Sequence, residues 1–189
     1  MQNRLKESAK YHANRIAQSI SGSDPKKHRY QIISDGDFQA SKLMLALDIR
    51  RLAEILSIHD YWVEKYQDDY EAFKSVAHND FLDILCRMIP HVGEFAIEYE
   101  PLLNYIKMFS GKRFKVKYGS DQGKSNDAIR AEVSSDIRFA ILVTSKIIHA
   151  DEFSVYDHAS TSMFSIAPLV MAGQLMLDRF AASLLNDGG

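Results

Sequence analysis

The sequence predicts an all-α fold: an irregular bundle of about five to seven helices with at most two or three short strands. Apolar residues recur at steps of three and four along most of the chain, which places them on one face of a helix. The alternation that is typical of strands is confined to short segments. With 189 residues, 46% of them hydrophobic, the chain can bury a sizeable core and is expected to form a single helical domain over residues 1–189.

The N-terminal segment is expected to form a helix over Arg4–Ser21, followed by a turn. The apolar face of this helix holds Leu5, Ala9, His12, Ile16 and Ile20. Gly22 and Pro25 predict the turn that ends the helix. A basic cluster, Lys26–Arg29, comes next, and Tyr30–Ile33 is expected to form a brief strand.

The second helix is expected over Phe38–His59, with Asp37 as its N-cap after an Asp35-Gly36 turn. Its seam at coiled-coil spacing is formed by Leu45, Ile49, Leu52 and Leu56, and is widened by Met44 and Ile55. A third helix is expected over Asp69–Ile89 and is ended by Pro90.

Helical spacing resumes over Val92–Phe109, where Pro101 interrupts it, and the period then changes. Arg113–Tyr118 alternates basic and apolar residues, which predicts a short strand, and Gly119–Ser125 is a loop. A long amphipathic helix is expected over Asn126–His149, and the last helix near Pro168, because proline is favoured in a first turn. The apolar faces of these two helices hold Ile129, Val133, Ile137, Ala140, Ile141, Ile147 and Ile148, and Leu169, Ala172, Met176, Phe180 and Leu184.

Charge is distributed unevenly along the chain, although the net charge is only −2. Met1–Ser34 holds seven Lys or Arg residues against two acidic ones, and Lys107–Lys124 holds six against one. The segment between them, Asp35–Ile106, holds six basic residues against fourteen acidic ones. These charges either pair within the fold or leave a basic surface for an anionic partner.

The compartment is expected to be the cytoplasm. The single cysteine, Cys86, lies in an apolar helical pattern and allows no internal disulfide. The N-terminal residues lack the apolar core of a secretory signal. The longest uncharged run, Ala159–Leu177, contains Ser, Thr and Gln residues that make it too polar for a membrane span. We therefore expect no membrane association.

Two basic segments, 26–29 and 107–124, are candidates for contact with RNA or DNA. The candidate binding residues are Lys26, Lys27, Arg29, Lys112, Arg113, Lys115, Lys117 and Lys124. In the second segment the cations alternate with Phe114 and Tyr118, so that cations can hold phosphates while rings stack on bases. The alternative is a solubilised edge strand, since lysines also block pairing between sheet edges.

The loop Gly119–Ser125 resembles the phosphate-binding loop of nucleoside triphosphatases, because Gly123-Lys124-Ser125 lies between a predicted strand and a predicted helix. It departs from that motif in the spacing of its glycines, which three residues separate instead of the four of the family. Tyr118 stands where the first glycine of the motif is expected. The alternative is an exposed loop without a ligand, and we expect no bound cofactor.

The segment Ser145-Lys146-Ile147-Ile148-His149-Ala150-Asp151-Glu152 resembles the motif region of the HEPN family. That family consists of small helical bundles, often linked to nucleic acid, and many members are metal-independent ribonucleases. Their active site pairs an Arg, commonly followed by Asn, with a His about five residues further on, so that Arg stabilises phosphorane charge while His moves a proton. The resemblance implies that His149 is the catalytic His. Thr144 and Ser145 occupy the Arg and Asn places, which implies an inactive or divergent member.

The histidines of the chain also allow simpler roles. His149 would be favourable merely as the end of a helix, where an imidazolium interacts with the helix dipole. The Glu-x-x-His motif of di-iron bundles is absent from the sequence. His91, Glu94 and Glu98 can line one helical face, and Asp151, Asp157 and His158 are close in sequence. Such spacing is common on solvated faces, so we expect no metal site.

Two functions remain open on the sequence alone. The first is a non-enzymatic helical interaction protein that forms a homo-oligomer through an apolar helix face and contacts RNA or DNA through the two basic segments. The second is a HEPN-like metal-independent ribonuclease, of toxin or defence type, centred on His149.

Overall fold

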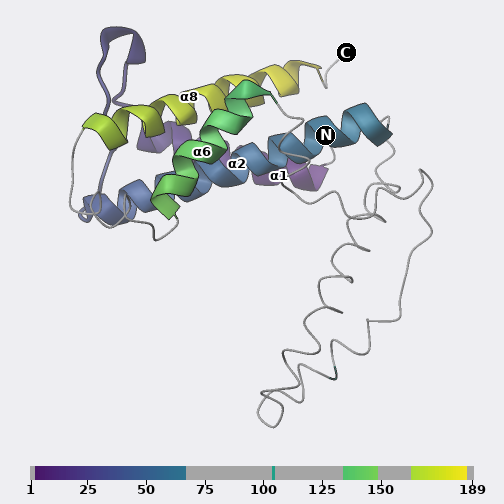
Figure 1. Cartoon of the computed structure of the whole chain (residues 1–189), viewed down its shortest axis with the longest axis horizontal. Coiled ribbons are helices and arrows are strands. Elements are labelled where there is room, and N and C mark those ends of the chain that lie inside the picture. The colour runs from purple at the N-terminus through teal and green to yellow at the C-terminus, as the bar shows by residue number, and fades with distance from the viewer. Residues whose placement is uncertain (1–2, 67–103, 105–133, 149–162, 187–189) are drawn as a thin grey trace. The chain divides into compact units, whose positions relative to one another are not determined.

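The computed structural model describes residues 3–66, 104, 134–148 and 163–186 (Figure 1). The chain divides into two compact units, Met1–Asp60 with Ala128–Gly189, and Tyr61–Asp127. Almost all described residues belong to the first unit. In the second unit they comprise the end of one helix and Asn104. The expectation of a single domain stays a prediction.

The first unit is built from helices, and its described residues contain no strand. In chain order the elements are α1 (Asn3–Ser19), the 3-10 helix η1 (Pro25–Lys27), α2 (Phe38–Tyr66), α6 (Ser135–Ile148) and α8 (Met163–Asn186). α8 packs against both α1 and α6, and α6 crosses α2 in the view of Figure 1. The all-α class is therefore confirmed for this part, whereas the count of five to seven helices stays a prediction.

α1 forms where a helix was predicted, and it buries the predicted apolar face. Ala9, Ile16 and Ile20 lie in the core, and Leu5 packs at its margin. His12, also predicted on this face, is only partly buried. Burial of such a stripe, rather than helix propensity, supplies most of the stability of a helix of this length.

The segment after α1 is a loop, so the strand predicted at Tyr30–Ile33 is wrong. The backbone N–H of Ile33 donates to the carbonyl oxygen of Ser19 at 2.8 Å. The Ser23 hydroxyl accepts from the N–H of Gln31 at 2.9 Å and donates to its carbonyl at 2.7 Å. These backbone groups are satisfied by the end of α1 and by a serine side chain, so no partner strand is needed.

α2 begins at Phe38 as predicted, because Asp37 caps it. The Asp37 Oδ1 atom accepts hydrogen bonds from the backbone N–H groups of Gln39 at 2.8 Å and Ala40 at 3.1 Å. The preceding turn places Gly36 at a φ of +142°, which a residue with a Cβ rarely adopts.

α2 continues to Tyr66, beyond the predicted end at His59. The predicted seam is buried throughout, at Leu45, Ile49, Leu52 and Leu56. Ile55 is also buried, but Met44 is 44% exposed, so the prediction that Met44 widens the seam is wrong. Met44 and Ile55 lie on nearly the same side of the helix. Their difference in exposure depends on which neighbouring segments cover each turn of the helix. Residue spacing does not specify that coverage.

α6 begins at Ser135, and Ser134 before it is not helical. The prediction of one uninterrupted helix over Asn126–His149 is therefore wrong at Ser134. The N–H of Arg138 donates to the carbonyl oxygen of Ser134 at 3.1 Å, which places Ser134 at the start of the helix, where serine is favoured. The predicted buried face is confirmed at Ile137, Ala140 and Ile141.

α8 begins at Met163, so the prediction of a start near Pro168 is wrong. Pro168 lies inside the helix, where its missing N–H removes only one intrahelical hydrogen bond near the N-terminus. The predicted face is buried at Leu169, Ala172, Met176 and Phe180, and Leu184 packs against the core. Within the ranges that the structure describes, no helix combines the length and the hydropathy needed to cross a membrane.

Gly173 allows α8 to approach α1 and α2 closely. A Cβ atom at this position would lie 3.2 Å from Ile16 Cγ2 and 3.3 Å from Ile49 Cδ1, which is tighter than most contacts of this kind. Both isoleucines are fully buried, so neither side chain can move into solvent. The three helices therefore meet at a point where only a hydrogen atom fits without displacement.

We predict that Gly173→Val destabilises the first unit. Overpacking at this junction is expected to lower the free energy of unfolding by about 1–3 kcal/mol, measured by urea denaturation. The matched control is Ala182→Val on the exposed face of the same helix, where a change of at most about 0.7 kcal/mol is expected from β-branching. Equal losses in the two variants would contradict the close approach at Gly173.

Candidate functional site

The basic loop, defined as Asp24–Arg29, projects from the first unit at the upper left of Figure 1. Asp24 and Arg29 close it by exchanging two backbone hydrogen bonds, with N–O distances of 2.8 and 3.0 Å. Inside it, the N–H of Lys27 donates to the Asp24 carbonyl at 3.0 Å and that of His28 to the Pro25 carbonyl at 3.1 Å. His28 adopts a left-handed φ of 51°, which turns the chain back. The loop backbone therefore has a defined shape.

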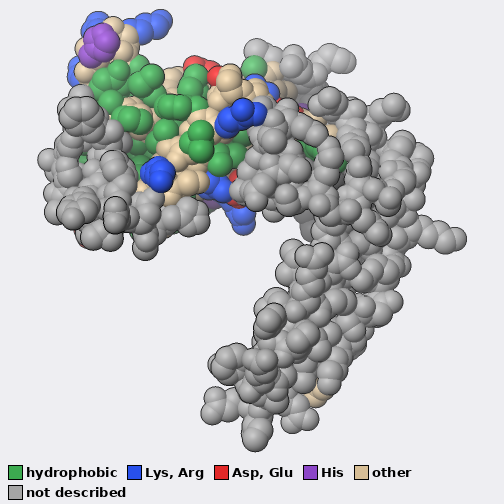
Figure 2. Space-filling view, viewed as in Figure 1, with side chains coloured by type: hydrophobic (Ala, Val, Ile, Leu, Met, Phe, Trp, Pro, Cys, Tyr) green, Lys and Arg blue, Asp and Glu red, His purple; other side chains and the backbone are tan. Residues whose placement is uncertain are grey.

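The side chains of this loop are mainly cationic and exposed. Lys26, Lys27, His28 and Arg29 all face solvent, and Figure 2 shows Lys, Arg and His side chains at this projection, beyond the hydrophobic ones. Lys27 Nζ lies 3.3 Å from Asp24 Oδ2, but the Lys27 side chain is 81% exposed, so this ion pair contributes little. Three cations on one closed loop are suited to bind phosphate groups.

The structure locates only part of the predicted nucleic-acid-binding set. Lys26, Lys27 and Arg29 lie together in the basic loop. The other members of the set lie outside the described residues: Lys112, Arg113, Lys115, Lys117 and Lys124. The glycine-containing loop Gly119–Ser125 also lies outside them. Whether the two basic segments form one surface therefore stays a prediction.

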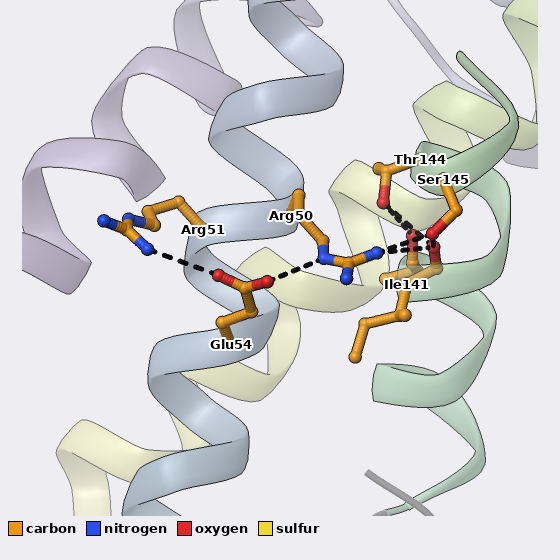
Figure 3. Close-up of polar contacts among 7 residues, drawn as sticks. Arg50, Arg51, Glu54, Ile141, Thr144 and Ser145 are labelled. Carbon is orange, nitrogen blue, oxygen red and sulfur yellow. Dashed lines mark hydrogen bonds and ion pairs between the residues drawn. The ribbon is translucent and has the colours of Figure 1, made fainter. Parts of the chain in front are cut away.

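His149, the predicted catalytic residue, lies outside the described residues, but the helix before it is described. From α2, Arg50 reaches this helix and donates through Nη1 to Ser145 Oγ at 2.6 Å and to the Ile141 carbonyl at 3.2 Å (Figure 3). Arg50 Nε donates to Glu54 Oε1 at 2.8 Å. A guanidinium group is thus held against the C-terminal half of α6.

The two residues at the Arg and Asn places of the HEPN-like motif are bonded within α6. Thr144 Oγ1 donates to the Ala140 carbonyl at 2.7 Å and is fully buried, and Ser145 Oγ donates to the Ile141 carbonyl at 2.7 Å (Figure 3). Thr144 is therefore satisfied by its own helix. The only cation shown near Ser145 in Figure 3 is Arg50, which comes from a different helix.

A second polar cluster joins α1 to α2 around Asp48, which is 5% exposed. Its Oδ1 lies 2.8 Å from His12 Nδ1, and its Oδ2 accepts from Arg15 Nε at 2.8 Å. Arg15 Nη1 in turn donates to the Tyr11 hydroxyl at 3.0 Å. The hydrogen bond to Asp48, and then that to Tyr11, raise the pKa of the Arg15 guanidinium. A buried carboxylate needs partners of this kind.

This cluster was not found from the sequence, although a signal for it exists. Asp48 falls among Leu45, Ile49 and Leu52 on the apolar side of α2. An ionisable residue at such a position is rarely buried without a partner. His12 on the predicted apolar face of α1 is the matching signal, but the sequence does not indicate which helix would meet it.

α2 is joined to α8 by a third cluster. Arg179 Nη2 donates to Asp60 Oδ2 at 2.6 Å, and His59 Nδ1 lies 3.7 Å from Asp60 Oδ1. Burial opposes ionisation of Asp60, but the nearby His59 ring and the hydrogen bond from Arg179 outweigh burial and hold the pKa of Asp60 below its ordinary value. The interactions join two packed helices, so we assign the cluster to stability.

No metal site is evident in the described part of the chain, where no group of three or more His, Cys, Asp or Glu side chains is arranged to hold an ion. His91, Glu94, Asp157 and His158 lie outside it.

Comparisons of the chain with protein-family models, with curated proteins and with solved structures found no match.

Proposed function

We propose that this chain is a non-enzymatic helical interaction protein of the cytoplasm that contacts nucleic acid through the basic loop. The observation that supports it is the exposure of Lys26, Lys27 and Arg29 on a loop whose backbone is closed by hydrogen bonds. Because the loop backbone already has a defined shape, little conformational entropy is lost when phosphates bind. The basic segment 107–124 is proposed to extend the same contact.

Binding of nucleic acid through the basic loop has a distinctive salt dependence. Each cation that neutralises a phosphate releases condensed counterions, so affinity falls as the salt concentration rises. Removal of three phosphate contacts is expected to make the slope of log affinity against log salt shallower by about 2–3 units. A loop whose charges served only solubility would change neither the affinity nor the slope.

We predict that the triple variant Lys26→Gln, Lys27→Gln, Arg29→Gln binds labelled RNA and DNA at least about tenfold more weakly at low salt. Fluorescence anisotropy over a series of salt concentrations measures both affinity and slope. The matched control removes the same number of charges from exposed positions on α2 and α6, through Arg51→Gln, Arg138→Gln and Lys146→Gln. Equal effects of the two triple variants, or no binding by the wild type, would refute the proposal.

Self-association is the second part of the proposal, with a second copy of the chain as the partner. α2 exposes three apolar side chains within two turns, Leu43, Met44 and Leu47, each at least 40% exposed. Single exposed apolar residues are common, whereas a contiguous group is typical of an interface. The group contains no charged residue, so two copies could meet through it without like-charge repulsion.

We predict that Met44→Gln with Leu47→Gln shifts the protein from oligomer to monomer in sedimentation velocity experiments, because the contact loses its apolar area. Leu142→Gln with Met171→Gln, which removes exposed apolar side chains from α6 and α8 instead, is the control and should leave the oligomer intact. A monomeric wild type at all accessible concentrations would exclude self-association.

A metal-independent HEPN-like ribonuclease is the second candidate function, and the placement of Arg50 favours it. The motif lacks its own Arg, but Arg50 brings a guanidinium to Ser145, which precedes His149 by four residues in the sequence. In this candidate, Arg50 stabilises phosphorane charge while His149 transfers the proton. Glu54 offsets part of the charge of Arg50, which argues for the non-enzymatic function.

We predict for this candidate that the wild type cleaves RNA in the presence of a metal chelator. His149→Ala is expected to lower the rate by at least about a hundredfold, and Arg50→Gln is expected to lower it as well. Arg51→Gln is the matched control and should retain cleavage. It also removes an arginine that donates to Glu54, but at the other carboxylate oxygen. Urea denaturation of each variant separates catalytic loss from unfolding. Unchanged cleavage by His149→Ala would eliminate the candidate.

A further inference from the structure

An exposed aromatic ring on α1 is held in place by its neighbours. The Tyr11 side chain is 56% exposed, although it is large and apolar over most of its surface. Its ring packs edge-to-face against His12, with the ring centroids 5.2 Å apart and the planes at 81°. The Arg15 guanidinium carbon lies 5.6 Å from the Tyr11 ring centroid, and Arg15 Nη1 donates to the Tyr11 hydroxyl. The ring therefore has a defined place at the surface.

Arg15 is anchored but still has hydrogen-bond donors to offer. A guanidinium carries five N–H groups, and the contacts with Asp48 and Tyr11 use two of them. The other three have no acceptor among the described residues. The Arg15 side chain is 36% exposed, so these donors can reach a ligand in solvent.

The buried carboxylate of Asp48 orients both groups. It bonds His12 and Arg15 at the same time, with both distances at 2.8 Å, and Asp48 itself is buried in α2. His12 and Arg15 in turn contact the Tyr11 ring. A ligand that used Tyr11 and Arg15 would thus meet side chains whose rotamers are already restricted, which lowers the entropic cost of binding.

We propose that Tyr11 and Arg15 bind one nucleotide unit of a single-stranded nucleic acid. The Tyr11 ring stacks on an unpaired base, and the unused Arg15 donors bind the adjacent phosphate. The faces of bases within a duplex are covered by their neighbours, so a surface ring of this kind selects single strands. This inference rests on the proposed nucleic-acid contact and specifies the form of nucleic acid that the chain binds.

The alternative role of the cluster is only to join α1 to α2. The two roles differ in what the Tyr11 ring contributes. Tyr11→Leu keeps apolar bulk and leaves the bonds of Asp48 to His12 and Arg15 in place, but it removes the aromatic face. Tyr11→Phe removes only the hydroxyl and keeps the aromatic face, so it is the matched control.

The experiment measures binding of the wild type, Tyr11→Leu and Tyr11→Phe to labelled single-stranded RNA, single-stranded DNA and duplex RNA at low salt. We expect Tyr11→Leu to weaken binding of the single strands by about 5- to 100-fold. We expect the affinity of Tyr11→Phe for single strands to stay within about threefold of that of the wild type. Duplex RNA should bind more weakly than single strands, and equally to all three proteins. A preference for RNA over DNA would assign the strand type. Urea denaturation confirms that each variant is folded.

Two results separate the inference from the proposed function. If the basic-loop triple variant loses binding but Tyr11→Leu binds single strands as the wild type does, the Tyr11 site is wrong and the nucleic-acid function stands. A wild type that binds duplex as tightly as single strands also overturns the Tyr11 site alone. If the wild type binds none of the three nucleic acids, the proposed function fails and the inference fails with it.

Discussion

Burial of the apolar seam of α2 is the contact on which the described part of the first unit depends. Leu45, Ile49, Leu52 and Leu56 are almost completely removed from solvent. Each such side chain contributes roughly 1.5–3 kcal/mol through burial, whereas a typical internal hydrogen bond contributes about 0.5–1.5 kcal/mol. Burial of the seam therefore stabilises α2 more than its individual polar contacts do. The polar contacts of α2 with its neighbours add less energy but specify which turns of the helices meet.

The two proposed nucleic-acid contacts share a physical basis. In the basic loop, backbone hydrogen bonds between Asp24 and Arg29 hold exposed cations on a closed turn. The buried Asp48 carboxylate of α2 orients Arg15 on α1 and, through Arg15, the Tyr11 ring. In both places the groups offered to a ligand are ordered by the fold, so that the entropic cost of ordering them is met when the chain folds.

The sequence by itself determined the features that depend on local spacing. The buried face of α1, the seam of α2 and the buried face of α8 follow from apolar residues at steps of three and four. The cap at Asp37 follows from the preference of a carboxylate for the free N–H groups at a helix start. The composition of the basic loop is equally local, since its cations are consecutive or nearly so.

Only the tertiary structure decided the features that depend on segments distant in the chain. Asp48 meets Arg15, and Arg50 meets Ser145, across separations that no periodicity specifies. Met44 is exposed although its spacing resembles that of a buried residue, because coverage depends on neighbouring segments. Gly173 marks a close helix approach that its residue type permits but does not require. Residue spacing determines which face of a helix is buried. Tertiary packing determines which segment covers that face, because the free energy of burial depends on the apolar area and not on the segment that covers it.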